Sequence, residues 1–136
     1  MHVESDIRYR EAEGFDPSLV SLDIYYEPLQ PNRPKRPVVV FIHGGGGVAG
    51  DKAFLGASSL QMPRRFVELG YVFVSVNYRL AKHPLSPGTN IVEMATDIAK
   101  ALKWLSVNIR RFGGQNTGFV LIGYSSGAHL AGLVAT

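Results

Sequence analysis

A serine between glycines is the residue whose surroundings most clearly suggest chemistry. Residues 123–127 read Gly-Tyr-Ser-Ser-Gly and match the pattern G-x-S-x-G. They follow the apolar run 119–122 and precede a segment rich in alanine and leucine, which is the strand–turn–helix context that this motif requires. Such a turn exposes the serine hydroxyl and aims helix amides at developing negative charge. We therefore predict that Ser125 is a nucleophile; a Gly/Ser turn without chemistry is the alternative.

A second glycine-rich stretch, His-Gly-Gly-Gly-Gly at residues 43–47, directly follows the apolar run 38–42. Successive glycines let the main chain approach a substrate, and a tetrahedral oxyanion needs amide donors about 3 Å away. We expect His43 to organise this loop rather than to act as a base. A plain glycine turn is one alternative and a phosphate-binding loop is another. The phosphate loop is disfavoured because Asp51, a carboxylate, precedes Lys52 where that motif needs lysine and then Ser or Thr.

The elements that must position these motifs alternate between strands and helices. Alternating apolar residues predict half-buried strands at 3–10 and 20–27, joined by a turn in a hairpin-like start. Continuous apolar runs predict buried strands at 38–42, 71–76 and 119–122, with helices at about 58–69 and 91–111. The pattern indicates an α/β fold with a doubly wound, mostly parallel sheet.

Both motifs follow predicted parallel strands directly. In open α/β sheets, ligands bind at the edge formed by the carboxyl ends of the strands. Two such strands side by side would bring the glycine loop next to Ser125. The loop amides should then point toward the serine hydroxyl, within about the span of one substrate carbonyl.

Composition narrows the classes of function. The chain has 136 residues, 46% hydrophobic and 18% charged, which suits a single folded domain. It contains no cysteine, so disulfides, thiolate catalysis and cysteine-bound zinc are excluded. No apolar run is long enough to span a membrane, no signal peptide pattern is visible, and no histidine or carboxylate cluster has metal-ligand spacing. We expect a cytoplasmic protein without membrane association, metal or cofactor.

The net charge of +3 is a weak basis for nucleic-acid binding. The densest basic stretch lies at 33–36 and is interrupted and bounded by prolines, which is typical of a solvated loop. We therefore expect no nucleic-acid partner.

Several stretches occur together and in order: 41–46, 75–80, the helix from Asp97 to Trp104 that ends in 112–114, and 123–131. This combination resembles the α/β-hydrolases, specifically carboxylesterases similar to hormone-sensitive lipase and kynurenine formamidase, over about residues 20–136. The resemblance implies that Ser125 is the nucleophile and that the amides of Gly45, Gly46 and Ser126 form the oxyanion hole, supported by His43 and Gly44. Gly47 departs from the family, which often has an aromatic residue there.

The remaining histidines have structural interpretations. His129 lies one helical turn past Ser125, and we expect it to be packed and hydrogen-bonded inside the protein. His83 is expected to belong to loop structure. The triad of hydrolases runs Ser, then Asp or Glu, then His along the chain. The eleven residues after Ser125 hold no carboxylate, so we expect the triad acid and base to lie outside this chain.

The leading hypothesis is a serine hydrolase that acts on carboxylic esters of small molecules through an acyl-enzyme. Residues 1–136 would then form the N-terminal portion of one α/β-hydrolase domain, cut after the Ser125 turn and holding about five of eight strands. An isolated chain of this kind should be inactive. It should associate through its exposed sheet edge or with a missing C-terminal segment. The alternatives are a non-catalytic interaction protein, or inactive fragment, on a hydrolase scaffold, and an arylformamidase.

Overall fold

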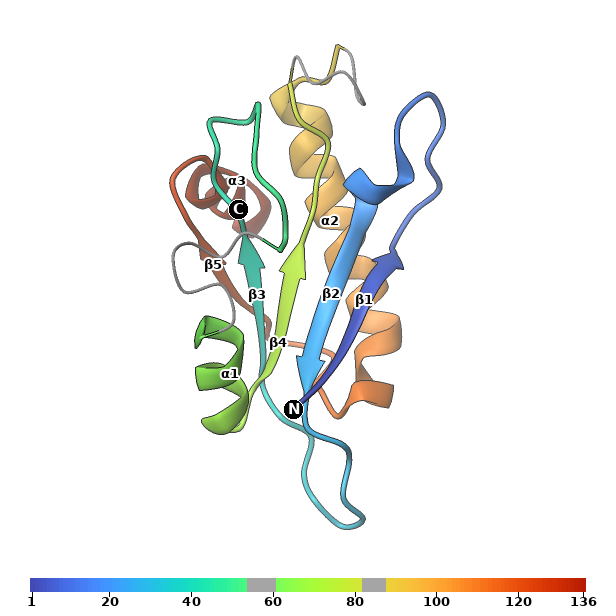
Figure 1. Cartoon of the computed structure of the whole chain (residues 1–136), viewed down its shortest axis with the longest axis vertical. Coiled ribbons are helices and arrows are strands. Elements are labelled where there is room, and N and C mark those ends of the chain that lie inside the picture. The colour runs from blue at the N-terminus through green and yellow to red at the C-terminus, as the bar shows by residue number, and fades with distance from the viewer. Residues whose placement is uncertain (54–60, 82–87) are drawn as a thin grey trace.

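The computed structural model describes residues 1–53, 61–81 and 88–136, and these form a five-stranded sheet with helices on both faces (Figure 1). The strand order is β1-β2-β4-β3-β5. β3 pairs in parallel with both β4 and β5, whereas β2 pairs antiparallel with β1 and β4. The predicted α/β class and the hairpin-like start are confirmed. The strands are β1 His2–Arg8, β2 Ser21–Tyr26, β3 Val38–Ile42, β4 Val72–Val76 and β5 Val120–Gly123.

The helices begin and end at local signals in the sequence. α2 spans Ile91–Asn108 and continues as the 3-10 turn Ile109–Phe112. Asn90 and Glu93 form a capping box at its start, because each side chain accepts a hydrogen bond from the other residue's backbone amide. Gly113 follows with φ 85°, a conformation that glycine adopts without strain. The others are α1 Gln61–Glu68, α3 Ser126–Ala135 and the short 3-10 turn Pro17–Val20. Residues 58–60 of the predicted first helix lie outside the described residues.

Alternating side chains of the central strands pack into different hydrophobic cores. Val38 and Val40 belong to the core that contains Ala101 and Leu105 of α2. The intervening Val39 and Phe41 belong to the core of Val67 in α1. α3 packs against α2, on the same side of the sheet. Because both faces are covered, the central strands are continuous apolar runs, as expected for parallel strands in α/β folds.

The prediction that both N-terminal strands are half-buried was wrong, in opposite directions for β1 and β2. All residues of β2 except Tyr26 are buried, while β1 is largely exposed. β2 lies inside the sheet between β1 and β4, so its polar residues are buried as well. Asp23 is buried with an ion pair to Lys52 at 2.9 Å, which satisfies its charge.

β5 lies at the end of the strand order and pairs only with β3 among the described residues. The prediction that this strand is buried was wrong: none of its residues is buried, and Val120, at its start, is 47% exposed, because the described residues cover its faces only in part. None of the helices described here is long and apolar enough to cross a membrane.

Candidate active site

Ser125 lies in the tight turn between β5 and α3. Its backbone has φ 54° and ψ −118°, a region that residues with a side chain rarely adopt and that indicates local strain. The turn is closed by hydrogen bonds from Gly127 N to the Tyr124 carbonyl and from Ala128 N to the Ser125 carbonyl, both 2.9 Å. The Ser125 side chain is exposed and makes no capping bond to its helix. The hydroxyl is therefore presented to solvent instead of completing the fold.

The glycines on either side of Ser125 allow this turn to pack closely. A Cβ on Gly127 would lie 2.1 Å from the Ile42 carbonyl oxygen and 2.5 Å from that of His43. A Cβ on Gly123 would lie 2.4 Å from the Cα of Ala128. No side chain fits at either position, so the first turn of α3 rests directly on the end of β3.

This packing brings the glycine loop that follows β3 against Ser125. A Cβ on Gly44 would lie 2.6 Å from the Tyr124 carbonyl oxygen and 3.2 Å from the Ser125 Cβ. The loop and the Ser125 turn thus lie together at the carboxyl ends of the parallel strands β3 and β5, as the sequence predicts for neighbouring parallel strands.

The next three glycines form the tip of the glycine loop. Gly45, Gly46 and Gly47 have φ values of 129°, 66° and 72°, which strongly favour glycine. The Gly45 carbonyl accepts hydrogen bonds from the amides of Val48 and Ala49 at 3.2 Å. Gly45 and Gly46 are exposed, whereas Gly47 is buried. The main chain at the loop tip is therefore open to solvent in the region next to Ser125.

His43 is buried at the base of the glycine loop. Its ring stacks on Tyr78, with centroids 4.4 Å apart, and its Nδ1 lies 2.8 Å from the Gly44 carbonyl oxygen. Because a carbonyl only accepts, we assign the ring proton to Nδ1. Burial lowers the pKa of His43, so the ring is neutral at pH 7. Its contacts are those of a residue that shapes the loop.

Two buried polar atoms at this site have no hydrogen-bond partner among the described residues: His43 Nε2 and Ser126 Oγ. The Ser126 hydroxyl is close enough to Tyr78 to lower the pKa of that phenol, although it makes no well-formed hydrogen bond. Burial has the larger effect and raises the pKa of Tyr78 overall.

The prediction for His129 was wrong, because its side chain is exposed and not packed inside the protein. The residues of α3 that are buried are Gly127 and Leu130, so His129 projects from the uncovered part of the helix. His83 lies outside the described residues.

An apolar cavity of about 280 Å³ adjoins the glycine loop and the start of α3. Gly47 has no side chain to fill it: a Cβ there would come within 3.5 Å of Met94 Cε. Met94 therefore forms the wall where the resemblance leads one to expect an aromatic residue. The cavity is lined by Gly46, Gly47, Ala81, Ile91, Met94, Ser126, His129 and Leu130.

The sequence analysis used the stretch 75–80 only for the resemblance and did not predict that the segment 77–81 after β4 contacts the glycine loop. Tyr78 donates its hydroxyl proton to the His43 carbonyl at 2.7 Å, and Ala81 N donates to the Gly47 carbonyl at 2.6 Å. The available signal was its position, since it follows a buried strand that is parallel to β3. It also missed Lys52, which is buried between the carboxylates of Asp6 and Asp23. No group of three or more potential metal ligands occurs in the described ranges.

Comparison with known proteins identifies the family of the chain. The profile of the BD-FAE family matches residues 22–136. The chain belongs to the BD-FAE family of α/β-hydrolases. Relatives of this BD-FAE chain include esterase LipC of Mycobacterium tuberculosis, 32% identical over 93% of the chain, and the probable N-octanoylanthranilate hydrolase AqdA2 of Rhodococcus erythropolis, 40% identical over 68%.

Solved esterase structures share the BD-FAE chain's fold. Esterase B of Lactobacillus rhamnosis superposes with a TM-score of 0.78 and 31% identity over 98% of the chain. A Thermogutta terrifontis esterase superposes with a TM-score of 0.70 and 26% identity over 95%. The BD-FAE chain spans 29% of LipC, 20% of AqdA2 and 38% and 43% of the two structures.

Proposed function

We propose that this chain carries the nucleophile and the oxyanion hole of a serine esterase. The Ser125 hydroxyl oxygen attacks the ester carbonyl carbon while a base takes its proton. The negative charge that develops on the carbonyl oxygen is stabilised by the amides of Gly45, Gly46 and Ser126. The alcohol leaves with a proton, and water then releases the acyl group from Ser125. The supporting observation is the strained Ser125 turn packed against Gly44 at one edge of the sheet.

A longer protein is required for this reaction, because a triad also needs an acid and a base. We propose that both come from sequence outside this chain, in which case residues 1–136 are the N-terminal portion of a single α/β-hydrolase domain. The small share of each relative that the chain covers supports this proposal. Cytoplasmic location, and independence of cofactors, metals, membranes and nucleic acids, stay predictions from the sequence.

The cavity beside the glycine loop supports a substrate with an apolar acyl group. Its position next to Gly46 and Ser126 is where the chain attached to a carbonyl bound at the proposed oxyanion hole could extend. An apolar acyl chain gains about 0.8 kcal/mol for each buried CH₂ group. We therefore propose small-molecule carboxylic esters as substrates.

Hydrolysis of an N-acyl arylamine is the second candidate function. It is favoured by the likeness to AqdA2, whose name gives an N-octanoyl substrate, and by the resemblance to kynurenine formamidase. The same nucleophile and oxyanion hole would serve, because both reactions pass through a tetrahedral oxyanion. A non-catalytic role on this scaffold is the third candidate.

The experiment compares substrates in a protein that contains this chain together with a triad acid and base. Turnover of p-nitrophenyl acetate, butyrate and octanoate is measured beside N-formyl and N-octanoyl arylamines, with Ser125→Ala as the control variant. We expect ester turnover that Ser125→Ala lowers by about 10⁶-fold, as removal of a serine nucleophile does elsewhere. Higher kcat/KM on N-acyl arylamines would replace the esterase with the amidase. Ester turnover unchanged in Ser125→Ala would contradict the assignment of Ser125.

A further inference from the structure

We infer that Tyr9, Arg10 and Asp97 are positioning residues for the glycine loop, and that they act through the segment Asn77–Ala81. This segment, here called the bridging segment, lies between the glycine loop and the three residues. The inference rests on the proposed function, because the loop that it concerns is the proposed oxyanion hole.

The bridging segment contacts the glycine loop along its whole length. Asn77 Oδ1 accepts from Lys52 N at 2.6 Å, in the chain that follows the loop. The Tyr78 ring covers His43 and its hydroxyl donates to the His43 carbonyl, at the loop's start. Ala81 N donates to the Gly47 carbonyl at the loop tip. A shift of the bridging segment would therefore move the loop at its start and tip, together with the chain that follows it.

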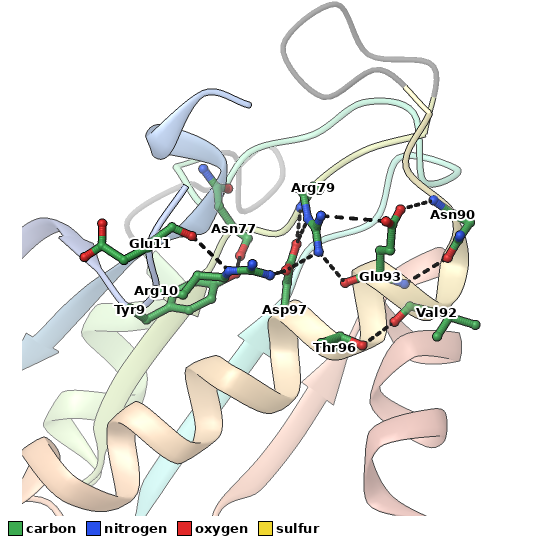
Figure 2. Close-up of polar contacts among 10 residues, drawn as sticks. All are labelled: Tyr9, Arg10, Glu11, Asn77, Arg79, Asn90, Val92, Glu93, Thr96 and Asp97. Carbon is green, nitrogen blue, oxygen red and sulfur yellow. Dashed lines mark hydrogen bonds and ion pairs between the residues drawn. The ribbon is translucent and has the colours of Figure 1, made fainter. Parts of the chain in front are cut away.

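Asp97 holds the bridging segment from α2 (Figure 2). Its carboxylate is fully buried and accepts from the Arg79 backbone amide at 3.1 Å. The Arg79 guanidinium also donates hydrogen bonds to both carboxylate oxygens, from Nε at 2.8 Å and from NH2 at 2.9 Å. Charge-assisted bonds of this forked kind are stronger and more directional than neutral ones. Asp97 thus fixes the main chain and the side chain of Arg79 together.

Tyr9 and Arg10 complete the contacts from the chain's N-terminal segment. Arg10 NH1 lies 2.6 Å from Asp97 Oδ1, and the Tyr9 hydroxyl donates to the Asn77 carbonyl at 2.7 Å. The Phe15 ring packs beneath both guanidinium groups, 4.8 Å from Arg79 and 5.5 Å from Arg10. Tyr9, Arg10 and Phe15 all precede residue 22, where the match to the BD-FAE family begins. The N-terminal segment therefore supports the loop from outside the matched region.

The chemistry of oxyanion stabilisation explains why these contacts matter. Amide donors help only when they point at the place where the oxyanion forms, and a displacement of about 1 Å can cost about 10²-fold in rate. None of the three residues lines the cavity beside the loop. Losing them should lower kcat, because negative charge on the carbonyl oxygen is absent from the bound substrate and develops only as the reaction proceeds, and should leave KM nearly unchanged.

Two mild variants test the inference while keeping the Asp97–Arg79 pair intact. Tyr9→Phe removes one hydroxyl, and Arg10→Met removes one guanidinium but keeps an apolar stem. Glu93→Gln is the matched control: Glu93 pairs with Arg79 at 3.9 Å, is 42% exposed and can keep its helix cap as glutamine. In the complete enzyme we expect the double variant to lose about 10- to 10²-fold in kcat on p-nitrophenyl butyrate. KM should change little. Replacing Arg10→Met by Arg10→Lys in the double variant should recover part of the loss in kcat. Glu93→Gln should have the kcat and KM of the parent protein.

A second measurement does not depend on catalysis. Hydrogen exchange at the amides of Ala81 and Lys52 reports on the contacts between the bridging segment and the glycine loop. We expect faster exchange at both amides in the double variant, and no change in Glu93→Gln. Unchanged kcat and unchanged exchange in the double variant would overturn the inference while leaving a Ser125-dependent esterase intact. An inactive parent protein would instead contradict the proposed function, and the exchange result would still decide whether Tyr9 and Arg10 position the loop.

Discussion

At the scale of single residues, the site depends on positions where no side chain fits. Gly44 and Gly127 let the glycine loop, the Ser125 turn and the end of β3 come into direct contact. Ser125 itself adopts a backbone conformation that most residues avoid. Such strain persists only where the surrounding structure holds it in place. The glycines on either side of Ser125 let the turn pack closely enough against β3 and α3 to be held in this conformation.

Gly127 and Gly132 form a matched pair for testing this account, because both lie in α3. Gly127→Ala would place a methyl group 2.1 Å from the Ile42 carbonyl, so we expect it to lower the free energy of unfolding by about 1–3 kcal/mol. Gly132 has nothing within 4 Å of its Cβ position, so Gly132→Ala should raise the free energy of unfolding by about 0.5–1 kcal/mol. Urea unfolding measures both. Equal effects of the two substitutions would show that the turn is not tightly packed against β3.

His43 should make stability depend on pH. Burial lowers its pKa below the ordinary value of 6.5, so the unfolded chain binds a proton at higher pH than the folded chain. The stability from neutral His43 is therefore complete above pH 6.5 and is lost as pH falls through the folded pKa. His43→Phe keeps a ring against Tyr78 but cannot titrate. We expect the melting temperature of the parent to fall more steeply than that of the variant between pH 7 and 5. Parallel pH profiles would rule out a buried, neutral His43.

At the scale of elements, hydrophobic periodicity predicts most of the structure. Strands β3, β4 and β5 and the long helix appear where the sequence predicts them, because their patterns reflect burial on one or both faces. The predicted burial is confirmed for β3 and β4 but not for β5. Burial of β2 could not be predicted, since it depends on the antiparallel pairing with β4 across about fifty residues. The exposure of His129 depends on which face of α3 is covered. Long-range packing decides both features, and local sequence does not encode it.

The candidate site likewise has one part that local sequence predicts and another part that depends on contacts between distant segments. The Ser125 turn and the glycine loop have local signatures, because glycine at fixed spacing is itself the signal. Lys52, Tyr78 and Asp97 lack such a signature. Their importance comes from contacts between segments far apart in the sequence, such as Asp97 with Arg10. A single sequence does not reveal which polar residues become buried partners.

The N-terminal cap of α2 provides a test at this scale. Asn90 accepts a hydrogen bond from the Glu93 amide at 3.0 Å, and α2 carries Asp97 and Met94. Asn90→Ala should lower the free energy of unfolding by about 1 kcal/mol, because it leaves a helix amide unsatisfied. Thr96→Ala, on the exposed side of the same helix, should change it by less than about 0.5 kcal/mol. Chemical denaturation compares them; an Asn90→Ala variant as stable as the parent would contradict the capping box.

At the scale of the whole molecule, the apolar strand β5 leaves one edge unpaired among the described residues. Exposed strand edges are templates for association with another chain. We expect residues 1–136 by themselves to dimerise through this edge, to bind a complementing C-terminal segment, or to aggregate. They should also fail to turn over ester, since serine is a weak nucleophile without a base. Size-exclusion chromatography and an ester assay test this. A stable monomer whose turnover is abolished by Ser125→Ala would contradict it and point to a base within this chain.

The most direct test of the central claim is covalent labelling of the serine in a protein that contains this chain with a complete triad. Fluorophosphonates react with activated serine hydroxyls, and esterase B has been solved with a tributyrin phosphonate inhibitor. Peptide mass spectrometry then locates the label. We predict a single adduct on Ser125, which disappears in Ser125→Ala and persists in Ser126→Ala, because alanine keeps the backbone amide at position 126. An adduct on Ser126 or elsewhere, or labelling that survives Ser125→Ala, would contradict the account.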